Sequence, residues 1–428
     1  MKRTVLVSLL VIAFVSVCVA APVFPRTGTA HGVGARAFSL ANNYTAVSND
    51  LTALYWNPAG LAFLPVREFQ MSLDGHRTNI SSDLSGYREN DYHERMKLNN
   101  IGLMAAIPTV QGGFTMAAAY HNPFAFDDIS SYRGTVRRGN SEVVLDQKYS
   151  VFGGLNMWSG GFGVQVAPNL GAGVSASIVS GHEEVRFHLV TDHINEGIKT
   201  DTVQNIYTDF FGYDMRVGLM YNYADLFRIG TRLVFPQTIR FKEKVVEETK
   251  TYRNGTESQS RTTGNYEGKL YSPMSGSVGA ALTLPFMTLT AEGRYTFPYT
   301  YVFPNDDIPT SSQARYFNTG AGLGVEVPLF FIPVILRGGY SYDKYDLYPY
   351  IAHYKNTSRN WSDQQLDKVK NNLQTISAGV GIVTQNTAFE IGYSFQTWGV
   401  STISILGRDM LNQDFKEHRA IATFSVRY

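Results

Sequence analysis

Seven side chains that could bind a metal ion fall within one short segment of the sequence. They are His182, Glu183, Glu184, His188, Asp192, His193 and Glu196. Imidazole nitrogens and carboxylate oxygens are ligands for zinc and related ions. The surrounding segment is strongly polar and lacks sustained alternation, which predicts an exposed loop with solvated charges. We therefore expect no metal site here.

Two pairs of opposite charges, Asp214 with Arg216 and Glu292 with Arg294, could support acid–base chemistry. Residues two apart lie on the same face of a strand, and both pairs belong to the polar face of an alternating segment. We expect them to form a water-facing charge network. No G-x-S-x-G motif and no Ser/His or Asp/His set is apparent. The sequence therefore predicts that the protein is not an enzyme and needs no cofactor.

The composition excludes one class of partner. Among 428 residues, 37 are basic and 36 acidic, and charged residues make up 17%. Because no basic excess is available for phosphate contacts, nucleic acid is not expected as a partner. Tyr and Phe number 26 each and Gly 39. Such a chain fits a protein whose apolar residues alternate with polar ones.

Residues 1–20 have the features of a secretory signal peptide. Two basic residues precede the apolar stretch Val5–Val17, and small residues lead to a cleavage site after Ala20. The stretch is too short to span a membrane. We therefore expect export. Cleavage would also remove Cys18, the single cysteine, and with it any disulfide or thiol chemistry.

The remaining chain alternates with period two from about residue 66 onward. In residues 213–223, one face carries Met215 and Leu219 among tyrosines, and the other carries Asp214 and Arg216. Segments of about ten residues with aromatic ends are typical of transmembrane β-barrels. No other apolar run approaches the ~20 residues that a membrane helix needs.

The sequence therefore predicts an all-β fold over 66–428, a transmembrane antiparallel β-barrel in the bacterial outer membrane. The last alternating segment ends on an aromatic residue, Tyr428, as such barrels commonly do. The alternative is a soluble β-sandwich, whose half-buried strands alternate too.

Polar segments give the number of strands. Seven long extracellular loops are expected at about 78–96, 122–146, 182–205, 242–266, 299–315, 345–371 and 399–415. Short turns are expected at 108–111, 157–168, 222–225, 285–286, 328–333 and 384–387. Seven loops alternating with six turns predict about fourteen strands, with both chain ends on the periplasmic side.

Residues 21–65 precede the first expected strand and are rich in glycine and other small residues. Wall side chains alone do not fill a barrel of this size, so this segment is expected to plug the lumen. It contains G-A-R-A-F, A-V-S-N-D and A-L-Y-W-N-P-A-G-L-A, a pattern that resembles the N-terminal hatch of the FadL/TodX family of outer-membrane transporters. Asn57, Pro58 and Ala59 match the Asn-Pro-Ala hatch motif of that family.

The resemblance implies a fourteen-stranded barrel with an N-terminal hatch. It also implies passive transport of long-chain fatty acids or other hydrophobic small molecules, with binding in an apolar pocket, movement of the hatch, and lateral release near the third strand. Candidate ligand-binding residues are Phe38, Leu54, Tyr55, Trp56, Phe124 and Phe126. For each of them, packing of the plug on the wall or of loop on loop is the alternative.

The same hatch also resembles PorV-like barrels. The alternative function is therefore a protein-secretion shuttle or a structural component of the outer membrane. Expected partners are a hydrophobic small-molecule substrate, outer-membrane lipid and lipopolysaccharide, and the barrel assembly machinery. The family precedent suggests a monomer.

Overall fold

The computed structural model describes residues 32–138, 141–297, 299–300, 315–316, 318–345, 351–354, 371–403 and 410–428. The expected signal peptide and most of the expected loops at 299–315 and 345–371 lie outside these residues. Within the described residues, three short helices precede the first strand: α2 (Ala35–Ser39), α3 (Ala53–Trp56) and the 3-10 helix η1 (Pro58–Phe63). No helix in the described part of the chain is long and apolar enough to cross a membrane.

Strands make up most of the described chain after residue 66. They are β1 (Arg67–Leu84), β2 (Tyr87–Ala106), β3 (Phe114–Ala125), β4 (Asp128–Arg138), β5 (Ser141–Ala167), β6 (Leu170–His193), β7 (Ile198–Tyr223), β8 (Phe227–Val234), β9 (Gln237–Arg253), β10 (Thr256–Ser272), β11 (Ser275–Leu284), β12 (Met287–Thr296), β13 (Tyr299–Thr300), β14 (Arg315–Tyr316), β15 (Thr319–Leu329), β16 (Val334–Tyr345), β17 (Ile351–Tyr354), β18 (Asn371–Val383), β19 (Thr387–Ile403) and β20 (Met410–Arg427). The pair β13–β14 forms a small separate sheet.

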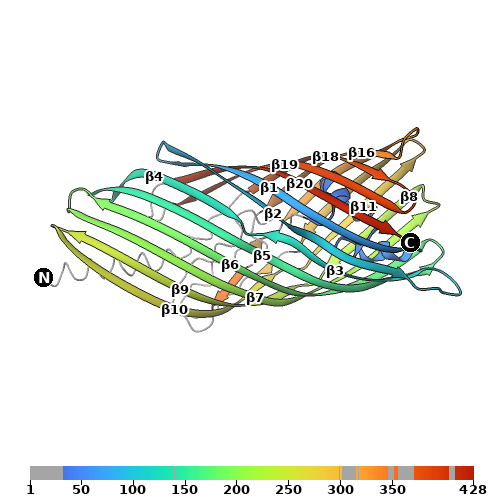
Figure 1. The fold of residues 1–428 in the computed structure, drawn as a ribbon, viewed down its shortest axis with the longest axis horizontal. Helices are drawn as coiled ribbons and strands as arrows, with labels where there is room; N and C mark the ends of the chain where they lie inside the picture. Colours follow the sequence, from blue (N-terminus) through green and yellow to red (C-terminus); the bar gives the residue numbers. More distant parts are fainter. Residues whose placement is uncertain are drawn as a thin grey trace.

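The main sheet closes into an antiparallel barrel (Figure 1). The last strand, β20, pairs with the first along nearly its whole length, from Glu68↔Arg427 to Leu84↔Leu411. Some positions in the wall are shared by two consecutive strands, because β3 and β4 both pair with β5, and β8 and β9 both pair with β7. Strands β10 and β11 likewise share the next position in the wall, because β10 pairs with β9 and β11 pairs with β8. Counted by wall position, the described barrel has fourteen strands, which confirms the predicted fold.

The polarity of the two faces reverses along the barrel. At the end that carries the C-terminus, here called the near end, β1 exposes Phe69 and Met71 outward and buries Glu68 and Gln70 inward. Toward the opposite, far end, the same strand exposes Arg77 outward and buries apolar residues inward. An apolar outer band is what lipid requires, whereas an outer face in water must be polar. The apolar band therefore occupies only the near part of the barrel.

This reversal corrects the predicted loops. The segments expected as loops at 78–96, 122–146, 182–205 and 242–266 are mostly strand, in long hairpins that extend the barrel to its far end. In 182–193, apolar side chains such as Phe187 point inward and most charged ones, with the exception of Glu183, point outward, so the segment alternates even though its average composition is polar. The expected turn at 157–168 is also wrong, since β5 continues to Ala167.

Residues 32–66, here called the plug, lie inside the barrel near the end that carries the C-terminus (Figure 1). The helix α2 contacts β18, β19 and β20, while η1 contacts β5, β6 and β7 on the other side. Nearly all plug residues are buried. The first strand, β1, begins at Arg67.

Candidate functional site

Asn57 of the hatch motif connects the plug to the wall. Its Nδ2 donates to the carbonyl oxygens of Thr45 (2.9 Å) and of Leu219 on β7 (3.3 Å). Its Oδ1 accepts a hydrogen bond from the Ala59 amide (3.2 Å), so the side chain also caps η1. The following Pro58 suits the first turn of a helix. The motif therefore fixes both the shape of the plug and its position on the wall.

Glycines on the inner face of the barrel let the plug backbone touch the sheet. A Cβ at Gly173 on β6 would overlap the Pro58 carbonyl, and one at Gly218 on β7 would overlap Oδ1 of Asn57. Further inner-wall glycines where a Cβ would meet plug atoms are Gly230, Gly322, Gly339, Gly379 and Gly392. Any larger residue at these positions would hold the plug away from the wall.

We expect Gly173→Ala to weaken plug docking. The added Cβ would meet the backbone of Pro58, which cannot yield as the end of a long side chain can. Overpacking of this kind costs about 1–3 kcal/mol. The plug should be cut faster in limited proteolysis, while heat-modifiable gel migration shows an intact barrel. The matched control is Gly160→Ala on β5, where a Cβ meets nothing within 4 Å. Equal sensitivity of the two variants would contradict the expectation.

A buried ion-pair network holds α2 on the other side of the barrel. Arg36 donates to both carboxylate oxygens of Glu326 on β15, at 2.7 and 2.8 Å. The same carboxylate accepts a hydrogen bond from Arg337 on β16 (2.7 Å), which also pairs with Glu390 (2.7 Å). Two-point bonding of arginine to carboxylate fixes orientation as well as distance. The plug is therefore oriented by charge at α2.

The charge pairs singled out in the sequence point into the lumen, as expected, but they hold the plug. Arg216 pairs with Asp214 (2.8 Å) and donates to the Tyr55 carbonyl (2.5 Å). Glu292 accepts a hydrogen bond from the Thr45 amide (2.8 Å). The predicted water-facing network is thus corrected to an anchor, because the plug occupies the space that the sequence pattern assigned to water.

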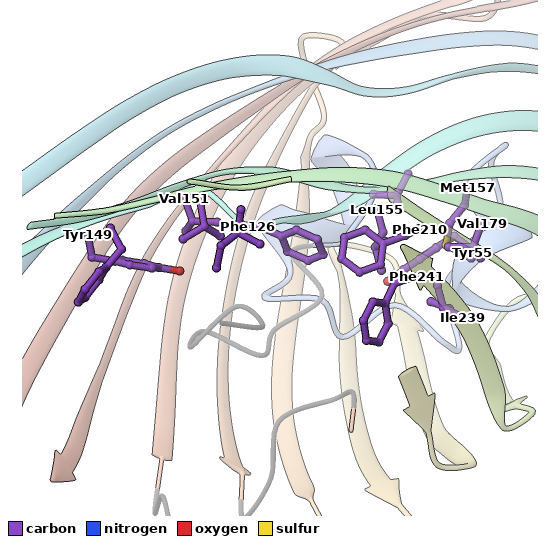
Figure 2. Close-up of a cluster of buried hydrophobic side chains, with 14 of the residues drawn as sticks. Tyr55, Phe126, Tyr149, Val151, Leu155, Met157, Val179, Phe210, Ile239 and Phe241 are labelled. Atoms are coloured by element: carbon purple, nitrogen blue, oxygen red, sulfur yellow. The ribbon is translucent and has the colours of Figure 1, made fainter. Parts of the chain in front are cut away.

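Apolar side chains line the inner face of the wall from the plug toward the far end of the barrel. We call this surface the inner track. Figure 2 labels ten of its members: Tyr55, Phe126, Tyr149, Val151, Leu155, Met157, Val179, Phe210, Ile239 and Phe241. The rings of Phe126 and Phe210 lie 5.8 Å apart, and those of Phe210 and Phe241 lie 6.4 Å apart. The track is therefore a buried, largely apolar cluster that reaches the plug.

Four of the six predicted ligand residues belong to this cluster. Tyr55 and Trp56 lie at its plug end, with rings 5.1 Å apart, edge to face. Phe126 is buried in the track, and Phe124 packs against it. The structure thus brings together two plug residues and two residues of the third wall strand, far apart in the sequence.

The other two candidates lie elsewhere. Phe38 packs with Ala35 and with Ile421 on β20. Leu54 packs in a cluster with Met104 on β2. Their surroundings correspond to packing of the plug on the wall, which is the alternative to ligand binding for these two residues.

The wall contains a seam beside the track. Backbone pairing between β2 and β3 ends at Asn100↔His121, and in the described ladders residues 87–98 of β2 pair only with β1. Side chains bridge the seam to the third wall strand. Asp91 accepts hydrogen bonds from the Ser131 amide and hydroxyl, both at 2.6 Å. Nearer the plug, Lys97 donates to Asn122 (2.8 Å). The ion pair of Arg95 with Asp127 lies between these two contacts.

The seven possible metal ligands are divided between two faces of β6 and its hairpin. His182 bonds to Asp209 (2.9 Å) and His188 to Asp201 (2.9 Å) on the outer face, whereas Glu183 is buried on the inner face. In the described residues, no group of three such side chains is arranged to hold a metal ion.

Most residues of the inner track were missed from the sequence. Val151, Phe210 and Phe241 come from three different strands, and Phe241 lies directly beside a segment assigned to a loop. Alternation was the signal that could have found them, since apolar residues recur at alternate positions in 185–189 and again at 239 and 241. This alternation indicates strands only if the apolar face of a strand is allowed to point into the lumen instead of toward lipid.

A closed fourteen-stranded barrel with an apolar outer band and an internal plug defines the class: a β-barrel of the outer-membrane type. The chain belongs to the BamG family, whose model matches residues 41–406. No curated protein matches the sequence.

Solved structures with this fold agree over almost the whole chain. The P. putida toluene transporter TodX is 15% identical, with a TM-score of 0.63 over 94% of this chain and 99% of that one. A Pseudomonas aeruginosa FadL homologue is 13% identical, with a TM-score of 0.58 over 92% and 98%. The Ralstonia pickettii toluene transporter TbuX is 12% identical, with a TM-score of 0.55 over 94% and 99%. At these identities the likeness establishes the fold, and it confirms the FadL/TodX-type architecture implied by the hatch.

Proposed function

We propose that the protein carries hydrophobic small molecules, long-chain fatty acids or other apolar compounds, passively across the outer membrane. The observation that carries the proposal is the inner track, a buried apolar surface that leads from the far part of the barrel to Tyr55 on the plug. Proteins of the same fold include a toluene transporter and a monoaromatic hydrocarbon channel, which supports this class of substrate.

Apolar contact supplies the binding energy. A hydrophobic molecule that leaves water gains roughly 25 cal/mol per Å² of apolar surface buried. A water-filled pore offers no such attraction. The track and its aromatic rings would therefore concentrate the substrate from dilute solution, as apolar pockets with few polar groups do.

The proposed exit is lateral, through the seam between β2 and β4. Phe124 and Phe126 belong to the track and lie at the break between β3 and β4. Opening the seam breaks side-chain bonds, such as those of Asp91 with Ser131, instead of a backbone ladder. Displacement of the plug, the hatch movement implied by the family resemblance, would accompany passage.

Uptake tests the proposal. Transporter-deficient cells that expose the barrel should take up radiolabelled oleate or toluene above the empty-vector level. Phe210→Gln should reduce that uptake about tenfold, because it removes a ring from the track and buries an amide. The control is Asp209→Asn, the outward-facing neighbour on β7.

No uptake of any hydrophobic probe by a correctly exposed barrel would overturn the proposal. That result would favour the alternative, in which the barrel binds protein partners or has a structural role. If Phe210→Gln and Asp209→Asn reduced uptake equally, the result would contradict passage of the substrate along the track.

A further inference from the structure

Four basic side chains gather on the outer face of two neighbouring strands, β9 and β10. They are Arg240, Lys242 and Lys244 on β9 and Lys269 on β10, all exposed. The three β9 residues occupy every second position, and Arg240 lies opposite Lys269 in the ladder, so all four point to the same side of the wall. Strands β7, β9 and β10 lie side by side there (Figure 1). We call these four residues the basic cluster.

The basic cluster carries an excess of positive charge. Among the described residues, none of its four members forms an ion pair. Two carboxylates share the surface, because Asp209 on β7 and Glu267 on β10 both lie opposite Lys242 in register. Asp209 is already bonded to His182 (2.9 Å). Four cations against two carboxylates make this surface suitable for an anion.

The basic cluster begins where the apolar outer band ends. On β7, Tyr213 and Phe211 are exposed, with rings 5.5 Å apart, and Phe211 lies opposite Arg240 in register. Trp158 on β5 is exposed in the same register row as Tyr213. Exposed aromatic residues mark the boundary between lipid and water in membrane barrels. The basic side chains directly beyond them therefore lie at the level of lipid headgroups.

The direction of the strands identifies the leaflet. Short turns close the near end, for example 168–169 between β5 and β6 and 384–386 between β18 and β19. In bacterial barrels such turns lie in the periplasm. The basic cluster lies on the far side of the apolar band and therefore contacts the outer leaflet. The characteristic lipid of that leaflet is lipid A of lipopolysaccharide, which carries phosphate on a sugar backbone with several acyl chains.

The apolar band contains a hollow of about 910 Å³. Its lining includes five exposed apolar or aromatic side chains, Phe162, Leu219, Val278, Tyr295 and Phe297. Asn57 and Pro58 of the plug approach the inner side of Gly218 and Gly173 but do not line the hollow, so the hollow opens outward. Its residues on β8 and β11 belong to strands that share wall positions with β9 and β10. The hollow and the basic cluster therefore occupy the same side of the barrel.

The distance between the basic cluster and the hollow corresponds to one leaflet. Phe211, opposite Arg240, and Val217, at the hollow, lie on the same strand β7. The intervening stretch of strand spans roughly 20 Å, and a tilt of about 45° reduces this to roughly 14 Å of membrane depth. Half of the hydrocarbon core is roughly 15 Å thick. A lipid with phosphate on the basic cluster can thus place an acyl chain in the hollow.

We propose that the basic cluster and the hollow together bind lipid A of the outer leaflet. Its phosphate accepts charge-assisted hydrogen bonds from Arg240 and the three lysines, and one acyl chain lies in the hollow. The site is on the outside of the wall, so it is separate from the inner track and does not depend on the proposed transport function.

The test counts lipids bound to the full-length barrel in detergent micelles by native mass spectrometry. Purified lipid A is titrated against phosphatidylglycerol, which has one phosphate and two acyl chains, and against inorganic phosphate. Lipid A should bind as one molecule per barrel and at least about tenfold more tightly than phosphatidylglycerol. Inorganic phosphate should not displace it, because phosphate alone makes no contact with the hollow.

The first variant is Arg240→Gln/Lys242→Gln/Lys244→Gln. Each basic side chain at a membrane surface strengthens the binding of an anionic lipid roughly fivefold, so lipid A should bind at least about tenfold more weakly. The matched control, Lys199→Gln/Lys250→Gln/Arg253→Gln, removes the same charges from exposed positions at the far tip of the β7–β9 ladder. The control should bind lipid A like the unaltered barrel.

The second variant, Gly293→Leu, fills the hollow. Gly293 lines the hollow, and a Cβ added there meets nothing within 4 Å, so the barrel should still fold. Lipid A should bind several-fold more weakly. The matched control is Gly160→Leu on β5, which is equally open but does not line the hollow. Heat-modifiable migration verifies the fold of every variant.

Three results would overturn the inference. Equal affinity for lipid A and phosphatidylglycerol would indicate attraction to any anionic lipid. Displacement of lipid A by inorganic phosphate would indicate a site for a soluble anion. Equal loss of binding in the Arg240→Gln/Lys242→Gln/Lys244→Gln variant and its control would show that net charge matters and the basic cluster does not. Each of these results leaves hydrophobic transport in place.

Discussion

A disulfide across the seam is expected to stop uptake of hydrophobic compounds. Asp91→Cys together with Ser131→Cys places the two thiols on β2 and β4, where the native side chains already bond at 2.6 Å. The single natural cysteine, Cys18, lies in the expected signal peptide, so the new pair would be the only thiols of the mature barrel. Oxidation should lower uptake at least tenfold, and a reductant should restore it.

The size of this effect follows from the kind of bond that closes the seam. Side-chain hydrogen bonds near the surface contribute roughly 0.5–1.5 kcal/mol each and break readily, whereas a disulfide holds until it is reduced. Radiolabelled uptake by oxidised and reduced cells measures the difference. The control pair is Asn79→Cys with Lys416→Cys, which joins β1 to β20 where a backbone ladder already exists. Full uptake through an oxidised seam would rule out this exit.

Asn57→Ala is expected to give the second large effect. The substitution leaves two carbonyl groups, of Thr45 and Leu219, and the Ala59 amide without their side-chain partner. Each buried group left unpaired costs about 1–3 kcal/mol, so the plug should lose much of its attachment to β7. Uptake should fall several-fold while the barrel still assembles, because the strands do not depend on this bond for their ladders.

Deleting residues 51–62 should lower uptake more than Asn57→Ala does, since the deletion removes α3, most of η1 and the plug end of the track. The measurement is oleate uptake normalised to surface-exposed barrel. Asn79→Ala, on the outer face of β1, is the matched asparagine control. Unchanged uptake in a well-folded Asn57→Ala barrel would show that plug position does not matter for passage.

Period-two alternation was enough to predict the barrel and its strand number. The pattern at 213–223 is local, because the residue at every second position faces the same side whatever the partner strand. Short turns and polar stretches then divide the chain, and closure with an even number of strands follows. Glycine and small residues before residue 66 likewise indicated a segment packed inside the wall.

The same local pattern could not predict which face of each strand points into the barrel. Phe187 and Phe210 lie on the lumen side although Tyr213 and Met215, on the same strand as Phe210, face outward. The medium outside the barrel decides this, and it changes from lipid to water along one strand without any change in period. The segment at 182–205 was therefore expected to be a loop, whereas it is strand with its apolar face turned inward.

The sequence by itself determined the barrel and its strand number, because these follow from periodicity and from the spacing of turns and polar stretches. Only the tertiary structure decided which side chains meet. Tyr55 joins Phe126, Arg216 holds the plug, and Arg240 aligns with Lys269 because the register of neighbouring strands brings distant positions to one level. Register depends on the pairing of the whole closed sheet, which no single segment specifies.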